Sequence, residues 1–215
     1  MLEDDVYKTI SGPAEGTYTE RRSRFLAFAF PIQTEDEFKE HLDEFKKEYY
    51  NARHICYAYM LGHEREDFRA NDDGEPSGTA GRPILGQINS NELTDILIIV
   101  VRFYGGIKLG TGGLIVAYRT AAAAAIEEAK IIKKTVDKEL FFTFEYPCMN
   151  DVMRIVKEEE PDVIEQNFEM DCSMRLRIRV SKMDRLKKRL SIVESVAFPE
   201  EEELEEQEEE QSAEE

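Results

Sequence analysis

Two glycine-rich segments decide the fold, NDDGEPSGTAGRP at residues 71–83 and RFYGGIKLGTGG at residues 102–113. Between them runs Ile96 to Val101, in which every residue is aliphatic. Such a run, bounded by turn signals, predicts a strand that is covered on both faces. Glycine at this density is costly to order, so we expect the flanking segments to make tight turns or close backbone approaches.

Length and charge set the class of protein. The chain has 215 residues, enough for one large or two small domains, and 41% of them are hydrophobic. Eleven glutamates in residues 200–215 supply more than half of the net charge of −18, and we expect this acidic tail to be disordered. The rest of the chain is only moderately acidic, so its overall charge gives no support for a nucleic-acid partner.

The chain is expected to be cytoplasmic, without metal or cofactor. Its cysteines, Cys56, Cys148 and Cys172, are widely spaced and form neither a CxxC pair nor a Cys/His ligand set. Reduced thiols in a cytosolic protein fit this pattern best. We find no signal-peptide pattern, and no apolar run approaches the roughly twenty residues that a membrane span needs.

Strands and helices alternate before residue 130. Thr34 and Glu37 form a capping box, which predicts a helix start, and Phe38, Leu42 and Phe45 follow at helical spacing. The alanines at 121–125 favour close packing of a later helix. The predicted elements are strands at 23–31, 54–61 and 96–101, and helices at 35–49, 80–88 and from 112 or 113 to 130.

A second domain is predicted after a polar junction at residues 133–138. The patterns that follow have the order β-α-β-β-α-β, which is the ferredoxin-like plan. They are a strand at 140–146, a helix from Pro147, a hairpin of 163–170 and 174–180, a helix from Ser181 and a last strand at 192–198.

The second glycine-rich segment is the main candidate site. Successive backbone N–H groups in such a turn can form an anion-binding nest, and the following helix offers its positive end. Lys108 would add a charge and Thr111 a hydroxyl, whereas the alternative is that the glycines only shape a turn. The candidate phosphate- or nucleic-acid-binding residues here are Gly105, Gly106, Lys108, Gly110, Thr111, Gly112 and Gly113, with Arg82 and Arg102 as weaker candidates.

Three carboxylates lie in the first segment, at Asp72, Asp73 and Glu75. They are able to hold Mg²⁺ or to act as acid and base, but an Asx-turn and a charge pair at a helix start are favoured. His54 is expected to be structural rather than catalytic, and Cys56 to be a small core residue. No catalytic residue is assigned.

A basic strip lies near the carboxyl end of the chain. Arg175, Arg177 and Arg179 alternate with aliphatic residues, which places three guanidinium groups on one sheet face. RNA is one interpretation. The alternative is neutralisation, because a hairpin turning about Cys172 would place Glu165 opposite Arg179, and Glu169 opposite Arg175.

At this point the sequence resembles a known family. The stretches DGEPSGTAG at 73–81 and RFYGGIKLGTGGL at 102–114 are similar to the signature of the IMPACT/YigZ family, and the resemblance covers roughly residues 15–130. The part after it is similar to the small domain of bacterial YigZ-type members, which is like the carboxyl-terminal domain of elongation factor G. The family motif falls on His54, Asp73, Gly74, Glu75, Pro76, Gly78, Thr79, Gly81 and Tyr104.

The resemblance implies an α/β (α+β) protein whose first domain, at residues 1–134, has the ribosomal protein S5 domain 2-like fold. The ferredoxin-like domain at 135–199 is predicted from the order of the patterns above, and the acidic tail at 200–215 is not part of the family pattern. Eukaryotic members of the family are translational regulators. The resemblance therefore implies a translation regulator that binds RNA, the ribosome or translation factors. From the residues themselves we expect no membrane partner and find no DNA-specific motif.

Two other functions stay open. One is a small-molecule kinase or phosphohydrolase that uses the glycine-rich loop and Mg²⁺ bound by Asp or Glu, although the sequence favours a protein that is not an enzyme. The other is a protein-binding module without nucleic-acid contact. The sequence gives no oligomeric state.

Overall fold

The computed structural model describes residues 5–169 and 171–199, and the acidic tail predicted at 200–215 lies outside them. The chain divides into two compact units, Val6–Lys134 and a second that begins at Thr135 and includes Asp5. Each unit has its own buried hydrophobic core. No helix in the described part of the chain is long and apolar enough to cross a membrane.

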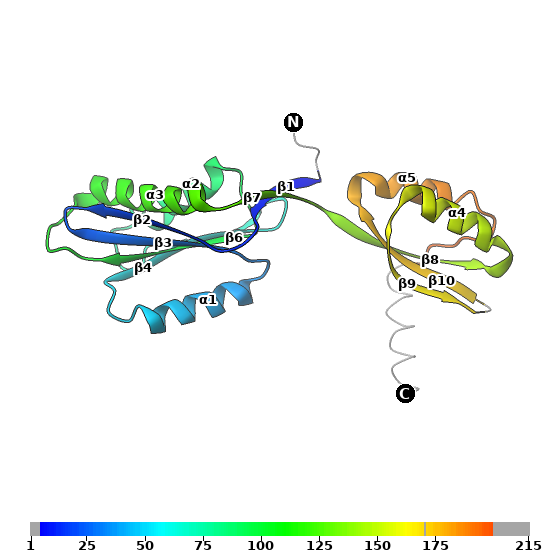
Figure 1. Cartoon of the computed structure of the whole chain (residues 1–215), viewed down its shortest axis with the longest axis horizontal. Helices are drawn as coiled ribbons and strands as arrows, with labels where there is room; N and C mark the ends of the chain where they lie inside the picture. Colours follow the sequence, from blue (N-terminus) through cyan, green and yellow to red (C-terminus); the bar gives the residue numbers. More distant parts are fainter. Residues whose placement is uncertain (1–4, 170, 200–215) are drawn as a thin grey trace. The chain divides into compact units, whose positions relative to one another are not determined.

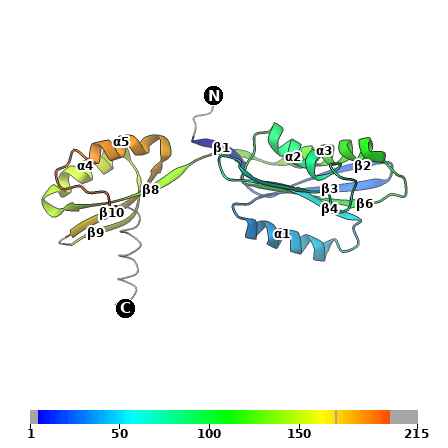
Figure 2. The same cartoon turned by 180° about the vertical axis from the view of Figure 1, so that it is seen from behind.

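The first unit is built on a five-stranded antiparallel sheet. In spatial order its strands are β2 (Ala14–Glu20), β3 (Ser23–Pro31), β6 (Ile96–Phe103), β4 (His54–Leu61) and β5 (Asp67–Asn71). Helix α1 (Glu35–Glu48) covers one face, while α2 (Gly81–Ser90) and α3 (Gly110–Glu128) cover the other (Figure 1, Figure 2). A separate pair joins β1 (Val6–Ile10) to β7 (Ile131–Thr135). The mixed α/β class predicted from the sequence is confirmed.

Strand β6 lies at the centre of this sheet, as the aliphatic run predicts. Residues 96–101 are all 0% exposed, because helices cover both faces of the sheet. Side chains alternate between the two sides of a strand, so every second residue belongs to the core under α2 and α3, and the others to the core over α1. The first set is Ile96, Ile98 and Val100, and the second is Leu97, Ile99 and Val101.

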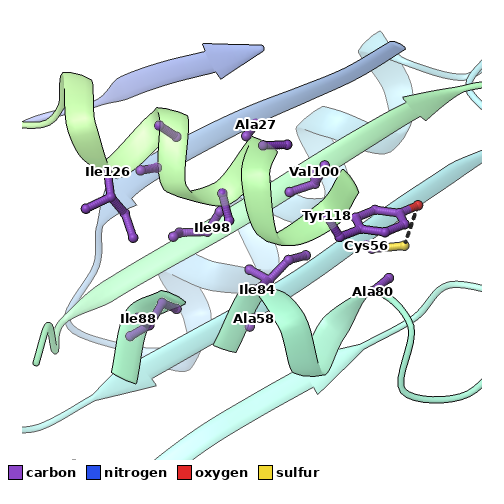
Figure 3. Packing of buried hydrophobic residues seen from close by; sticks show 14 of the residues in the cluster. Ala27, Cys56, Ala58, Ala80, Ile84, Ile88, Ile98, Val100, Tyr118 and Ile126 are labelled. Atoms are coloured by element: carbon purple, nitrogen blue, oxygen red, sulfur yellow. Dashed lines mark hydrogen bonds between the residues drawn. The ribbon is translucent and has the colours of Figure 1, made fainter. Parts of the chain in front are cut away.

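Small residues let α3 approach the sheet closely. Ala121, Ala122 and Ala125 on its inner face are fully buried. On the strand below, a Cβ added to Gly16 would lie 2.3 Å from the backbone nitrogen of Ala125, so only glycine fits there. Figure 3 shows the same layer from close by, with Tyr118 of α3 among the buried side chains. The predicted packing role of the alanines is confirmed.

The second unit has a three-stranded antiparallel sheet with the order β8 (Asp137–Glu145), β10 (Asp171–Arg179) and β9 (Asp162–Phe168). A 3₁₀ turn, η1 (Tyr146–Cys148), leads into α4 (Met149–Glu159), and α5 (Val180–Leu190) follows β10. Both helices pack on the buried face of the sheet, around Phe142, Leu176 and Leu186.

The last strand predicted at residues 192–198 is wrong. Only one bridge forms there, in which Thr143 and Ala197 exchange two backbone hydrogen bonds of 3.0 Å. Further along β8, the Ser195 hydroxyl accepts the N–H of Glu145 at 3.0 Å, so a side chain replaces the next rung of the ladder. The unit therefore follows the β-α-β-β-α order and carries a single bridge where the sixth element was expected.

Candidate functional site

The first glycine-rich segment (residues 71–83) supplies its own anion to the helix that follows it. One carboxylate oxygen of Asp72 accepts the N–H groups of Ala80 at 2.9 Å and Gly81 at 2.8 Å, and the other accepts that of Gly78 at 2.7 Å. Burial opposes ionisation of Asp72, yet these three donors hold the pKa of its carboxyl below the ordinary value of 3.8. The amino-terminal end of α2 is therefore closed by a protein side chain.

The neighbouring carboxylates are also occupied. Asp73 accepts the N–H of Ile55 at 2.6 Å, and its own N–H donates to the side chain of Asn71 at 2.8 Å, as in an Asx-turn. Glu75 is buried and paired with Arg102. In the described residues, no group of three or more His, Cys, Asp or Glu side chains is arranged to hold a metal ion.

The second glycine-rich segment (residues 102–113) leaves its amides open. Helix α3 begins at Gly110 and is preceded by Leu109, whose side chain cannot accept a hydrogen bond. Gly106 and Gly110 have positive φ angles of 86° and 72°, which favour glycine. In the described part of the chain, no group accepts the N–H groups of residues 106–112, whereas the N–H of Gly105 donates to Ser23 Oγ at 3.2 Å.

Four residues of this open run, at 108–111, line a pocket of about 610 Å³, here called the α3 pocket. It lies between the end of β6, the start of β4, the first turn of α3 and the tip of the first glycine-rich segment. Lys108 and Arg53 are exposed and bring positive charge, and Tyr104 is 47% exposed. The lining residues are Arg53, His54, Glu75, Pro76, Arg102, Tyr104, Lys108, Leu109, Gly110, Thr111 and Leu114.

A buried ion pair forms one wall of the α3 pocket. Arg102 Nη1 donates to Glu75 Oε1, and both side chains are almost completely buried. The Tyr118 hydroxyl donates to the same oxygen at 2.8 Å. The Arg102 Nε has no hydrogen-bond partner among the described residues, and the guanidinium lies 5.5 Å from the centres of both the Phe25 and Tyr104 rings. Much of the charge of Arg102 is therefore balanced inside the protein.

Behind this wall lies a thiol that is unsuited to nucleophilic chemistry. Cys56 Sγ is 3.0 Å from the carbonyl oxygen of Asp72 and 3.4 Å from the hydroxyl of Tyr118, a contact drawn in Figure 3. Burial raises the pKa of the Cys56 thiol, and burial likewise raises the pKa of Tyr118. Because the thiolate is the nucleophilic form, Cys56 is held in its unreactive state. Its predicted position in the core is confirmed.

His54 is held in one tautomer. Its Nδ1 lies 2.6 Å from the carbonyl oxygen of Asp73, and a carbonyl only accepts, so Nδ1 carries the hydrogen. Its Nε2 is 3.8 Å from Glu75 Oε2. In the neutral ring, Nε2 is therefore an acceptor beside a second acceptor.

The structure brings together only some of the residues predicted for phosphate binding. Gly105 is needed for packing, since an added Cβ would lie 2.1 Å from the backbone of Arg22. Arg82 is exposed but lines a different hollow of about 390 Å³ together with Gly78 and Arg119. The Glu75–Arg102 pair was missed by sequence reasoning, because its members are 27 positions apart and follow no repeating pattern.

The arginine strip of the second unit is paired with acidic side chains. Between guanidinium nitrogen and carboxylate oxygen, the distance is 3.6 Å for Arg175 and Glu165, 2.9 Å for Arg177 and Glu139, and 2.7 Å for Arg179 and Asp5. The hydrogen bond to Glu139 raises the pKa of Arg177, while the bonds from Arg179 and Ser181 hold the pKa of Asp5 far below its usual range. The ion-pair interpretation therefore describes this strip better than a free RNA-binding surface.

The strand register proposed for those ion pairs is wrong. Glu165 lies opposite Arg175, not Arg179. Cys172 is itself part of β10 and faces Phe168, so the hairpin turns before Cys172, and a bulge between Arg175 and Leu176 shifts the pairing again.

Comparison with known proteins agrees with the signature in the two glycine-rich segments. The family model of the Impact N-terminal domain matches residues 21–126. The chain is 33% identical over 154 residues to the IMPACT family member YvyE of Bacillus subtilis, which covers 72% of this chain and 71% of that protein. This chain belongs to the IMPACT family. The resemblance predicted from the sequence is thus confirmed.

A second IMPACT family member and a solved structure are similar to this chain over both units. YigZ of Escherichia coli is 29% identical over 165 residues, which is 76% of this chain and 81% of YigZ. A crystal structure of a hypothetical protein superposes with a TM-score of 0.69 at 26% identity, and covers 92% of this chain and 98% of that one.

Proposed function

We propose that this IMPACT family member regulates translation by binding RNA phosphates at the open amino-terminal end of α3. The observation that carries the proposal is the difference between the two glycine-rich segments. Asp72 occupies the amides before α2, while the amides of residues 106–112 have no acceptor in the described part of the chain. An uncapped helix start with free N–H groups is a ready anion site.

Side-chain charges favour the same guest. Lys108 and Arg53 are exposed and line the α3 pocket. Glu75 does not repel an anion strongly, because Arg102 and Tyr118 both donate to it. The translational role itself is supported by the family resemblance. The strip at Arg175, Arg177 and Arg179 is left out of the proposed surface, since its guanidinium groups already contact carboxylates.

The test compares two double variants of equal charge. Arg53→Ala with Lys108→Ala removes two exposed cations from the α3 pocket. Arg82→Ala with Arg119→Ala removes two from the separate hollow, and serves as the control. Affinity for RNA is measured over a range of salt concentrations, together with co-sedimentation with ribosomes.

If two phosphate contacts are lost, the salt dependence of the first variant should fall by about two in log–log slope. The control should keep the parent slope. Equal slopes and equal co-sedimentation for both variants and the parent would overturn the proposal. Arg102 is kept in both variants because its removal would unbalance the buried Glu75.

The enzyme alternative is not favoured by the structure. Asp72 and Asp73 are engaged by backbone amides, and Glu75 by Arg102, so none of the three is arranged to receive Mg²⁺. A thermal-shift measurement with ATP and Mg²⁺ checks this, since a stabilisation of several degrees would reinstate a nucleotide-hydrolysing or phosphoryl-transferring site.

A further inference from the structure

We propose that the α3 pocket takes one unstacked nucleotide, with its phosphate on the first turn of α3 and its base on the ring of Tyr104. This inference rests on the proposed function and narrows its ligand to a nucleotide whose base is free. Such a nucleotide occurs in single-stranded RNA and in free nucleoside monophosphates, and the experiment below distinguishes the two sources.

The pocket has the right size and boundaries for such a unit. Its volume of about 610 Å³ lies within the range of sites that enclose a small organic molecule. Pro76, Leu109 and Leu114 provide apolar surface around it. A base in a duplex has both faces stacked and its edge paired, so it cannot enter unless it is flipped out.

Tyr104 is suited to receive the base. Its ring is 47% exposed, although it lies at the pocket wall. The Arg102 guanidinium lies over the Tyr104 ring, 5.5 Å from its centre, in a cation–π contact. The exposed part of the ring remains available for stacking with a base. Aromatic side chains of this kind stack on unpaired bases without strong sequence preference.

The polar groups of the pocket match a nucleotide better than a bare phosphate ion. Lys108, Thr111 and the free amides of residues 110 and 111 are donors, which complement phosphate oxygens. Glu75 Oε2 and, in the neutral ring, His54 Nε2 are acceptors 3.8 Å apart, and both residues line the same pocket. A phosphate oxygen cannot satisfy them, whereas a ribose hydroxyl or a base amino group can.

The wall of the pocket contains a buried donor that the described residues leave unsatisfied. Arg102 at the end of β6 is 5% exposed and lines the pocket, and its Nε lacks a hydrogen-bond partner among the described residues. A buried donor without a partner is uncommon in a folded protein.

The experiment uses the full chain and three probes: a short single-stranded RNA, a blunt-ended duplex that contains the same strand, and adenosine monophosphate, which is used as a competitor and also alone in calorimetry. The RNA carries a fluorescent adenine analogue whose emission falls when it stacks. The chain has no tryptophan, so the protein contributes little background. The variants are Tyr104→Ala, Tyr104→Phe and, as the matched exposed tyrosine outside the pocket, Tyr50→Ala; Tyr50 is 83% exposed.

We expect the single strand to bind and its fluorescence to be quenched, the duplex to bind at least about tenfold more weakly, and Tyr104→Ala to lose about tenfold in affinity together with the quenching. Tyr104→Phe keeps an aromatic ring and should therefore restore the quenching that Tyr104→Ala loses, whereas Tyr50→Ala should behave like the parent. Direct binding of the monophosphate in calorimetry, with no oligonucleotide binding, would support the nucleotide pocket and assign it to a free nucleotide.

Two outcomes count against these ideas separately. Equal affinity for single strand and duplex, with full binding and quenching in Tyr104→Ala, would overturn the nucleotide pocket while the phosphate site stands. If the parent chain associates with neither RNA nor ribosomes and also fails to bind the monophosphate, both the nucleotide pocket and the proposed function are overturned. Thermal unfolding of each variant confirms that it is folded.

Discussion

The two glycine-rich segments of the first unit differ in whether the protein supplies an acceptor for the backbone N–H groups before the following helix. Each leaves a strand and feeds a helix, and neither helix has a capping side chain on the residue before it. Before α2, Asp72 reaches forward and accepts three N–H groups. Before α3, seven consecutive amides find no acceptor in the described residues. Glycine content alone does not distinguish a closed turn from an open one; a nearby carboxylate does.

The open segment has a cost in stability. A missing helix cap is typically worth roughly 1 kcal/mol. The residue at the capping position of α3 is nevertheless Leu109 instead of an aspartate or serine. Natural proteins tend to break a local rule of this kind at sites that bind something. The predictions below test whether the two helix starts differ as described.

The largest effect is expected from the buried pair beneath the open segment. Arg102→Met would leave Glu75 buried without its charge partner, which should lower the free energy of unfolding by about 3–5 kcal/mol. Urea unfolding measures the loss. The double variant Glu75→Leu with Arg102→Met removes both charges and should lose clearly less than the single variant. Equal losses would mean that packing, rather than charge balance, holds the wall of the pocket.

Both segments contain one glycine that is fixed by a neighbouring backbone. A Cβ on Gly105 would lie 2.1–2.5 Å from backbone atoms of Arg22 and Ser23, and one on Gly81 would lie 2.6 Å from the nitrogen of Asn71. Replacing either glycine with alanine should destabilise the chain by about 2–3 kcal/mol. Gly112→Ala is the control, because nothing lies within 4 Å of its added Cβ. Tolerance of Gly105→Ala would show that the segment does not need its close approach to β3.

The closed segment can be opened by changing Asp72. Asp72→Asn keeps the shape but leaves one oxygen for three donors, so the free energy of unfolding at neutral pH should fall by about 1–2 kcal/mol. The folded-state pKa of Asp72 is lowered, so its contribution is present above the unfolded pKa of about 4 and is lost as the pH falls through the folded value. The difference between parent and variant should therefore narrow below about pH 4.

Urea unfolding at pH 7 and pH 3 measures that difference. Asp43→Asn, an exposed change on α1, is the control and should alter stability little at either pH. A gap that stays constant from pH 7 to pH 3 would show that the charge of Asp72 does not hold the helix start.

Features that depend on neighbouring residues were predictable from the sequence. The aliphatic run at 96–101 predicted a strand covered on both faces, and its residues are fully buried. The capping box at Thr34 forms within one turn of helix, where the Glu37 N–H donates to the Thr34 hydroxyl at 3.2 Å. The candidate phosphate segment was also found from its local pattern, although its function stays a prediction.

Features that depend on one distant atom were not. A single hydroxyl, that of Ser195, replaces a rung beside β8 and turns a predicted strand into a bridge. A bulge between Arg175 and Leu176 shifts a register that pattern alone left free. Glu75 pairs with Arg102 because the end of β6 lies beside the first glycine-rich segment, and the sequence does not show this neighbourhood. Arg102 was therefore predicted to bind phosphate, whereas its guanidinium forms an ion pair with Glu75.

The smallest expected effect comes from a substitution that gives the free amides at the start of α3 an acceptor from the protein itself. Thr111→Asp places a carboxylate in the first turn of α3, where the helix dipole and free amides favour negative charge, so the chain should gain about 0.3–1 kcal/mol of stability. RNA binding should fall at the same time, because the new carboxylate occupies the donors and faces Lys108. Thr111→Asn has a similar size without the charge and should change both quantities less. Opposite signs for stability and binding would follow only if the amides are empty in the free protein and filled by a ligand. A loss of stability would show that these amides are already satisfied, and unchanged RNA binding would place the phosphate elsewhere.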